Sequence, residues 1–277
     1  MADDDPARRV LTLTTDFGLA DPYVAAMKGV ILGMSPRVTI VDISHDVQPQ
    51  QLRQAVYISQ SAWPYFPESA VHVVVVDPGV GTERRAVVLE TPRGLFVGPD
   101  NGVLSAALPD EVLEQAGNGK PVALPAGCRA FAITSRELMR EPVSATFHGR
   151  DIFAPVAAHL SLGLKPGAVG SALDAIVGLP PLRASRCEDG SLRGEVLHID
   201  RFGNVVTDAR AEDAPPGRVA VEVASRVVLG LVRTYADAEG LTALTGSSGY
   251  IELAVPGGSA AAVLGAKVGD PVVVRRA

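Results

Sequence analysis

The sequence predicts an α/β protein with two domains, an N-terminal α/β domain over residues 1–180 and a smaller β-rich domain over residues 186–277. Three observations support this prediction. The valine run that begins at Val71 is continuous rather than alternating, which is typical of a strand buried on both faces inside a parallel sheet. Strand and helix patterns alternate before it. Short β segments separated by turns dominate the C-terminal part.

The N-terminal segments alternate between strand and helix. Asp21 and Pro22 are a favourable cap and first-turn pair for the first helix, and Pro36 follows its end. Alternation of this kind builds a parallel, Rossmann-like sheet with helices on its faces. The expected order is strand Val10–Thr15, helix Tyr23–Met34, strand Val38–Ile43, helix Gln50–Phe66 and the valine strand.

The segments after the valine strand depart from simple alternation. Turn residues between two β-branched stretches predict a hairpin, and a permissive Gly98–Gly102 loop leads into a further helix. The expected elements are a hairpin of Ala86–Glu90 and Gly94–Val97, a helix around Leu104, a strand over Ala130–Thr134 and a helix over Ile152–Leu162.

A domain boundary is predicted at Gly178–Ser185, where paired prolines cannot continue a helix and make a stiff connector. Beyond it, turn residues separate short β segments, which favours a small barrel or sandwich. The expected strands are Leu192–Ile199, Val205–Thr207, Arg218–Val223, Tyr250–Val255 and Pro271–Arg275.

The amino-acid composition indicates which kinds of molecule the protein binds. The net charge is −6 with 25 basic residues, so no broad cationic surface for nucleic acid is expected, and a small-molecule ligand fits better. Cys128 and Cys187 are far apart and lack a metal-type spacing. The N-terminus MADDDPARR has no apolar signal core and no segment has the length of a membrane span, which predicts a cytoplasmic protein without a membrane partner.

Asp77 and Arg84 are the first candidate functional pair. Asp77 follows the valine strand, and open α/β sheets bind ligands at the carboxyl ends of their strands. The loop PGVGTERR then brings an arginine back within reach, and an aspartate held by arginine stays ionised and oriented. An ordinary strand-end turn with surface arginines is the alternative interpretation.

Other polar clusters admit two interpretations each. The turn Asp200–Asn204 joins an acid, an aromatic ring and an amide, or is simply a hairpin with favourable turn residues. His148 precedes a helix, where it could act chemically or only cap and pack. Asp42, His45 and Asp46 lie in one short loop with no second cluster to complete a coordination shell, so no metal site is predicted.

Seven motifs, in this order, carry a resemblance that covers nearly the whole chain: LTTDFG, DISHDV, VDPGVGTERR, GPDNG, TFHGRD, HIDRFGNVVTD and SSGYIELA. Together they resemble the family of S-adenosyl-L-methionine hydroxide adenosyltransferases, relatives of the fluorinases and chlorinases. The resemblance implies an N-terminal α/β domain, a C-terminal β-barrel and a homotrimer whose active sites lie between subunits. It implies attack of water or hydroxide on the ribose C5′ of S-adenosyl-L-methionine, which gives adenosine and L-methionine.

The resemblance also implies roles for individual residues. Two positions depart from the fluorinase-like pattern, because Ser248 stands in place of an arginine and Tyr23 in place of a serine. The implied catalytic triad is Asp77, Arg84 and His148; the implied substrate contacts are Asp16 to the ribose hydroxyls, Asp21 and Asp200 near the methionine ammonium, Phe202 and Asn204 to adenine, and Ser247 at the methionine end.

These residue types suit a sulfonium substrate. A sulfonium is an activated leaving group, so the enzyme needs no cofactor and no acid, only an aligned nucleophile and a rigidly held ribose. With Asp77 paired to Arg84 and His148 able to accept a proton, water is the expected nucleophile, whereas a halide would lie beside a carboxylate. A halide transferase of the chlorinase kind and a non-catalytic adenosine- or S-adenosylmethionine-binding module are the alternatives.

Overall fold

A computed structural model describes residues 10–116 and 119–277. The acidic and basic stretch at residues 1–9, from which the lack of a signal core was inferred, lies outside these ranges. The chain divides into two compact units, Met1–Pro181 and Leu182–Ala277. Each unit has its own sheet and its own hydrophobic core.

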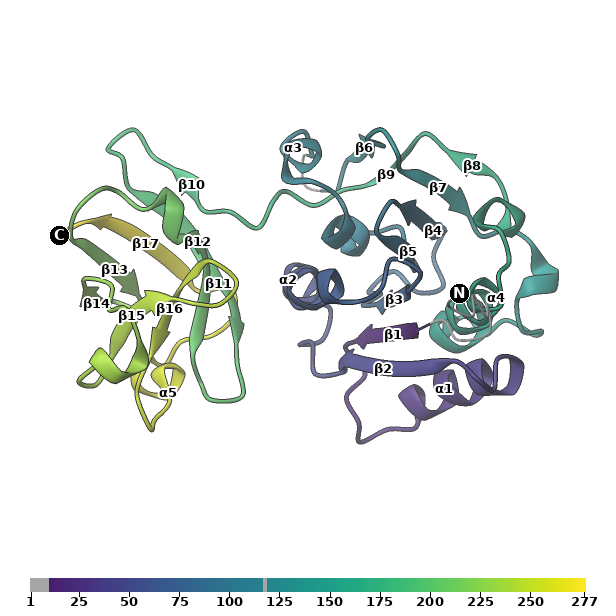
Figure 1. Cartoon of the computed structure of the whole chain (residues 1–277), viewed down its shortest axis with the longest axis horizontal. Coiled ribbons are helices and arrows are strands. Elements are labelled where there is room, and N and C mark those ends of the chain that lie inside the picture. Colours follow the sequence, from purple (N-terminus) through teal and green to yellow (C-terminus); the bar gives the residue numbers. More distant parts are fainter. Residues whose placement is uncertain (1–9, 117–118) are drawn as a thin grey trace, which may run out of the picture. The chain divides into compact units, whose positions relative to one another are not determined.

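The first unit is built on a seven-stranded mixed sheet with the order β2-β1-β3-β5-β4-β7-β8 (Figure 1). The neighbours β2, β1, β3 and β5 pair in parallel, whereas β4, β7 and β8 continue the sheet in antiparallel pairs. The strands are β1 Val10–Thr15, β2 Thr39–Ser44, β3 Val71–Val75, β4 Ala86–Thr91, β5 Gly94–Pro99, β7 Arg129–Ala132 and β8 Ala172–Leu173; β6 Pro121–Ala123 and β9 Ala175–Val177 form a separate pair.

Helices cover both faces of this sheet, as Figure 1 shows. On one face, α1 (Tyr23–Met34) and α4 (Ala154–Ser161) pack against odd-numbered β3 residues such as Val73. On the other face, α2 (Leu52–Ala62) packs with Val74 and its even-numbered neighbours. All five residues of β3 are buried, which confirms that the valine run is a strand covered on both sides.

The order β2-β1-β3 means that successive strands are added first on one side of β1 and then on the other. The chain leaves β1 for β2 on one side and returns to β3 on the other, and such switch points leave a crevice at the carboxyl ends of the strands. Asp16 follows β1, and Asp77 follows β3 by two residues. The topology therefore brings these two carboxylates to one edge of the sheet.

Several predicted helices differ in kind or length from the structure. The helix expected over Gln50–Phe66 ends at Ala62 and continues as a 3₁₀ turn around Pro64, which has no N–H to extend the α-helical ladder. The helix expected around Leu104 is a 3₁₀-helix, Val103–Ala107. The last helix of the unit begins earlier than expected, as a π-helix over Gly149–Phe153 that leads into α4.

The second unit is an antiparallel, barrel-like sheet with the path β14-β13-β17-β11-β12-β16-β15, which confirms the predicted fold class. The five predicted strands are present, and β10, β14, β15 and the short α5 were not predicted. The elements are β10 Ser185–Arg186, β11 Leu192–Ile199, β12 Val205–Arg210, β13 Val219–Val223, β14 Arg226–Leu229, β15 Thr242–Thr245, β16 Tyr250–Ala254, α5 Ala260–Leu264 and β17 Pro271–Arg276.

No helix within residues 10–116 and 119–277 combines the length and apolar character needed to cross a bilayer. Both cysteines are half-buried free thiols. Burial raises the pKa of the Cys128 thiol.

Candidate active site

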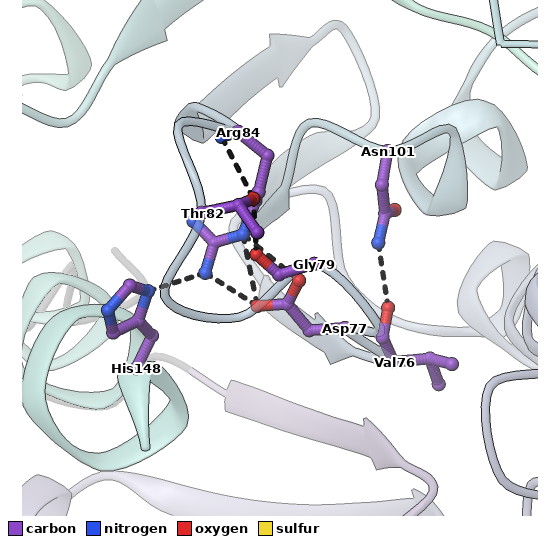
Figure 2. Close-up of polar contacts among 7 residues, drawn as sticks. All are labelled: Val76, Asp77, Gly79, Thr82, Arg84, Asn101 and His148. Atoms are coloured by element: carbon purple, nitrogen blue, oxygen red, sulfur yellow. Dashed lines mark hydrogen bonds and ion pairs between the residues drawn. The ribbon is translucent and has the colours of Figure 1, made fainter. Parts of the chain in front are cut away.

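Asp77 and Arg84 lie at the two ends of the loop that follows β3 (Figure 2). The loop closes through two backbone turns and through the Thr82 hydroxyl, which donates to the Gly79 carbonyl over 2.7 Å. Gly81 has φ +78°, and a Cβ added there would lie 2.4 Å from the Ala145 carbonyl oxygen. Only glycine fits this close approach to the segment that precedes His148.

Arg84 connects the other two members of the predicted triad, as Figure 2 shows. Its Nε donates to both carboxylate oxygens of Asp77 over 3.0 and 3.1 Å, and its Nη2 donates to Oδ2 over 2.5 Å. The same Nη2 lies 2.6 Å from Nδ1 of His148. The Asp77 and Arg84 side chains are only 5% and 10% exposed, so this ion pair is shielded from solvent. The structure thus brings the three residues together.

His148 is the residue before the π-helix Gly149–Phe153. That helix also supplies Phe153, whose ring lies under the Arg84 guanidinium at 5.3 Å. Partial burial of the imidazole, together with the nearby arginine, lowers the pKa of His148 below its usual value. This π-helix and the residue before it therefore place the Phe153 and His148 side chains against Arg84. Because its pKa is lowered, the His148 imidazole is neutral at pH 7.

Asp16 shares a pocket of about 360 Å³ with Asp77 and His148. Its Oδ2 accepts a hydrogen bond of 2.9 Å from the backbone N–H of Gln50. Burial raises the pKa of Asp16, and the Gln50 N–H opposes that shift. Gln50 holds a left-handed φ of +66°, a strained conformation for a residue with a side chain, and the sequence carries no signal for it.

Three aromatic rings line the same pocket: Phe17, Tyr23 and Phe147. Their centroids lie 5.2–5.9 Å apart in tilted and edge-to-face pairs. Asp21, the expected ammonium contact, is exposed just before α1 and is not part of the pocket lining. Of the five predicted site residues in this unit, four line the pocket or bond directly within it.

In the second unit, Asp200, Phe202 and Asn204 line one pocket of about 690 Å³. The Asp200 carboxylate organises the turn, because it accepts from the backbone N–H groups of Phe202 and Asn204 over 2.9 and 2.8 Å and from the Asn204 amide over 2.9 Å. The Phe202 ring is 76% exposed. An exposed ring beside a fixed amide suits a flat heteroaromatic ligand.

Tyr235 also lines this second pocket, and no sequence motif singled it out. Its hydroxyl donates to the buried Glu252 over 2.6 Å. That hydrogen bond raises the pKa of Tyr235 to about 12, and burial raises the pKa of Glu252. Ser247 lies in the exposed turn before β16 and is not part of the pocket lining.

The short loop with Asp42 and His45 has a structural role. Asp42 pairs with Lys28 over 2.5 Å and lies 3.0 Å from Nε2 of His45, whose Nδ1 lies 2.8 Å from the Thr15 hydroxyl. Within residues 10–116 and 119–277, no group of three or more His, Cys, Asp or Glu side chains could hold a metal ion. These contacts anchor the strand end that leads into Asp16.

Comparison with protein families matches both units. Residues 11–170 match the SAM hydroxide adenosyltransferase N-terminal domain, and residues 194–273 match the corresponding C-terminal domain. A relative from Thermus thermophilus, named (R)-S-adenosyl-L-methionine hydrolase, is 43% identical over 274 residues, which cover 95% of this chain and 98% of the relative. A hydrolase of the same name from Salinispora arenicola is 40% identical over 95% of this chain and 97% of its own length.

More distant relatives include a fluorinase from Actinoplanes sp., 26% identical over 97% of this chain and 98% of the fluorinase. Among solved structures, an uncharacterized conserved protein from Thermotoga maritima superimposes with a TM-score of 0.80 at 36% identity, covering 96% of this chain and 100% of that protein. As the seven motifs predict, the chain belongs to the S-adenosyl-L-methionine (SAM) hydroxide adenosyltransferase family.

Proposed function

We propose that the protein hydrolyses S-adenosyl-L-methionine to adenosine and L-methionine by attack of water on the ribose C5′. The observation that carries this proposal is the contact of Arg84 with both Asp77 and His148 beside the pocket that also holds Asp16. The hydrolase relatives at about 40% identity support the same substrate and reaction.

The negative charge of the Asp77 carboxylate favours water over a halide as the nucleophile. Its carboxylate is 5% exposed and lines the pocket, where repulsion between a halide and a carboxylate is weakly screened. A water molecule instead donates a hydrogen bond to the same carboxylate. The sulfonium leaves as a neutral thioether, so we expect no metal or cofactor requirement and no change of rate with a chelator.

We assign substrate contacts by pocket. We propose that Asp16, in the first pocket, accepts hydrogen bonds from the ribose hydroxyls, and that Phe202 and Asn204, in the second, offer a stacking ring and an amide to adenine. Asp21, Asp200 and Ser247 are proposed contacts of the methionine end, on the strength of the motifs that contain them. The family resemblance further supports a homotrimer with active sites between subunits, acting on a small molecule in the cytoplasm.

Incubation of purified protein with S-adenosyl-L-methionine, followed by chromatography, tests this proposal. The expected products are adenosine and L-methionine in equal amounts, unchanged by added chloride or fluoride. A 5′-halo-5′-deoxyadenosine product would identify a halide transferase. Tight binding by calorimetry with an intact ligand after long incubation would identify a binding module instead.

A further inference from the structure

The contact between Arg84 and His148 determines which nitrogen of the imidazole carries a proton. Nη2 of Arg84 lies 2.6 Å from Nδ1 of His148 (Figure 2). A guanidinium has donors and no acceptor, and it keeps its proton in proteins. Nδ1 must therefore be the acceptor in this hydrogen bond, so it carries no proton. The neutral imidazole then carries its proton on Nε2.

Because of this contact, His148 cannot act as the general base that deprotonates water. The lone pair that could take a proton belongs to Nδ1, and Arg84 occupies it. Protonation of Nδ1 would set two N–H groups against each other at 2.6 Å and would place an imidazolium beside a guanidinium. The sequence-based expectation that His148 accepts a proton overlooked this, because the motif does not reveal which nitrogen faces the arginine.

The other charged groups around His148 do not reverse this conclusion. Asp77 reaches the imidazole through Arg84, Asp16 lines the same pocket, and Asp151 is bonded to Arg150 over 2.7 Å. These carboxylates favour imidazolium, yet burial and Arg84 oppose them, and the net effect lowers the pKa of His148.

Asp77 retains the capacity to accept a proton. A carboxylate offers about four lone-pair positions. Arg84 uses three of them at most, with one hydrogen bond to Oδ1 and two to Oδ2. Oδ1 is thus able to accept one further hydrogen bond, and Asp77 lines the pocket.

We infer that His148 acts as a neutral Nε2–H donor that orients the attacking water, and that Asp77 is the group that takes the proton. This inference rests on the proposed hydrolysis and deepens it. The water oxygen forms a bond to C5′ while the C5′–S bond breaks, and the bonding pair stays on sulfur, which leaves as the thioether of methionine. One water proton passes to the Asp77 carboxylate and then to solvent.

Nitrogen-15 NMR of the histidine rings tests the tautomer without any turnover. His148→Gln identifies the His148 signals by their loss. The expected pattern at pH 7 is a protonated Nε2 and an unprotonated Nδ1. A protonated Nδ1, in either the other tautomer or the imidazolium, overturns the inference even when the protein is an active hydrolase.

Kinetics of two amide variants test the division of roles. Glutamine retains an N–H donor near the Nε2 position but cannot take a proton, so His148→Gln is expected to lose about tenfold in kcat, as for one weakened hydrogen bond. Asp77→Asn removes the proton acceptor and is expected to lose about 10²–10⁴-fold. A His148→Gln loss as large as that of Asp77→Asn, with substrate binding retained in calorimetry, would assign the proton to His148 and overturn the inference.

Discussion

Arg84 makes three kinds of contact at once, and each depends on the shape of the guanidinium. It holds Asp77 with two nitrogens, donates to His148 with one of them, and lies over the Phe153 ring. An ammonium group has one nitrogen and no planar face, so lysine cannot reproduce this set. The geometry of the triad is therefore a property of arginine and not of positive charge alone.

Arg84→Lys should lower kcat by about 10²-fold with a smaller change in KM, because the nucleophile loses its alignment while the substrate contacts remain. Steady-state product formation measures both constants. Arg129→Lys is the matched control, since Arg129 is 68% exposed and pairs with Glu90 at the surface. Equal effects of the two substitutions would show that only the charge at position 84 matters.

His72 couples stability to pH. Its ring is 1% exposed, stacks on Phe96 and bonds Thr12, and burial lowers its pKa to about 4. The unfolded chain, with a histidine pKa of about 6.5, binds the proton first as the pH falls. Stability is therefore full above about pH 6.5 and is lost as the pH falls toward 4.

Between pH 7 and pH 5, His72 alone should cost about 2 kcal/mol of unfolding free energy. Urea denaturation at the two pH values measures this loss. His72→Gln has no titrating ring, so its stability should fall less over the same interval. An identical fall in both proteins would place the acid sensitivity elsewhere.

At the residue scale, the sequence identified the three members of the triad but not how they meet. The motifs TERR and TFHGRD predicted Arg84 and His148. Which imidazole nitrogen faces the guanidinium depends on the direction of a side chain in a folded helix, and no sequence pattern encodes it. For the same reason the sequence did not predict the role of Gln50 beside Asp16, because no sequence pattern marks a glutamine with a left-handed backbone.

At the scale of elements, the loop after β3 fits against the segment that precedes the π-helix Gly149–Phe153. Gly81→Ala should unfold or shift this loop, since the added Cβ meets the Ala145 carbonyl at 2.4 Å in addition to the strained φ. Gly190→Ala is the matched control, because it has the same φ of +78° with nothing within 4 Å.

Thermal or urea denaturation and product assays measure both glycine variants. The control should lose about 1–2 kcal/mol, the usual cost of a left-handed non-glycine residue, and keep its activity. The Gly81 variant should lose more stability and most of its turnover. Similar stability and activity in the two variants would mean that the close approach to Ala145 is not required.

Regular elements were the easiest to predict. The valine strand and the first helix follow from hydrophobic pattern and turn residues. The expected Asp21 cap was wrong, because Pro22 holds the N-cap position of α1 and no side chain donates or accepts a capping hydrogen bond there. The π-helix at Gly149–Phe153 was not predicted, since hydrophobic spacing does not separate a π-helical turn from an α-helical one. It packs closely against α1, where a Cβ at Gly149 would lie 3.1 Å from the Met27 sulfur. β14 and β15 were missed because they are four residues each and carry weak alternation.

At the scale of the whole molecule, the proposed substrate contacts other than Asp21 and Ser247 fall in two pockets that belong to different units. Asp16, Asp77 and His148 line one, and Phe202 with Asn204 lines the other. The change from alternating elements to short strands predicted both folds. The assembly of copies has no sequence pattern of its own, so the trimer rests on the family resemblance.

Mixing two variants, each impaired in a different unit, tests a site shared between subunits. Asp77→Asn removes function from the first unit, and Asn204→Ala weakens adenine binding in the second. If each site takes one unit from each of two copies, trimers reassembled from both variants will contain some intact sites and recover activity. Each variant reassembled alone is the control, and a mixture no more active than the controls would contradict shared sites.

The central claim is that a water held by Asp77, Arg84 and His148 attacks the ribose C5′. Turnover in ¹⁸O-labelled water, followed by mass spectrometry of both products, tests it most directly. The account predicts one ¹⁸O atom in the 5′-hydroxyl of adenosine and none in methionine. Unlabelled adenosine, or label in the amino-acid product, would contradict it.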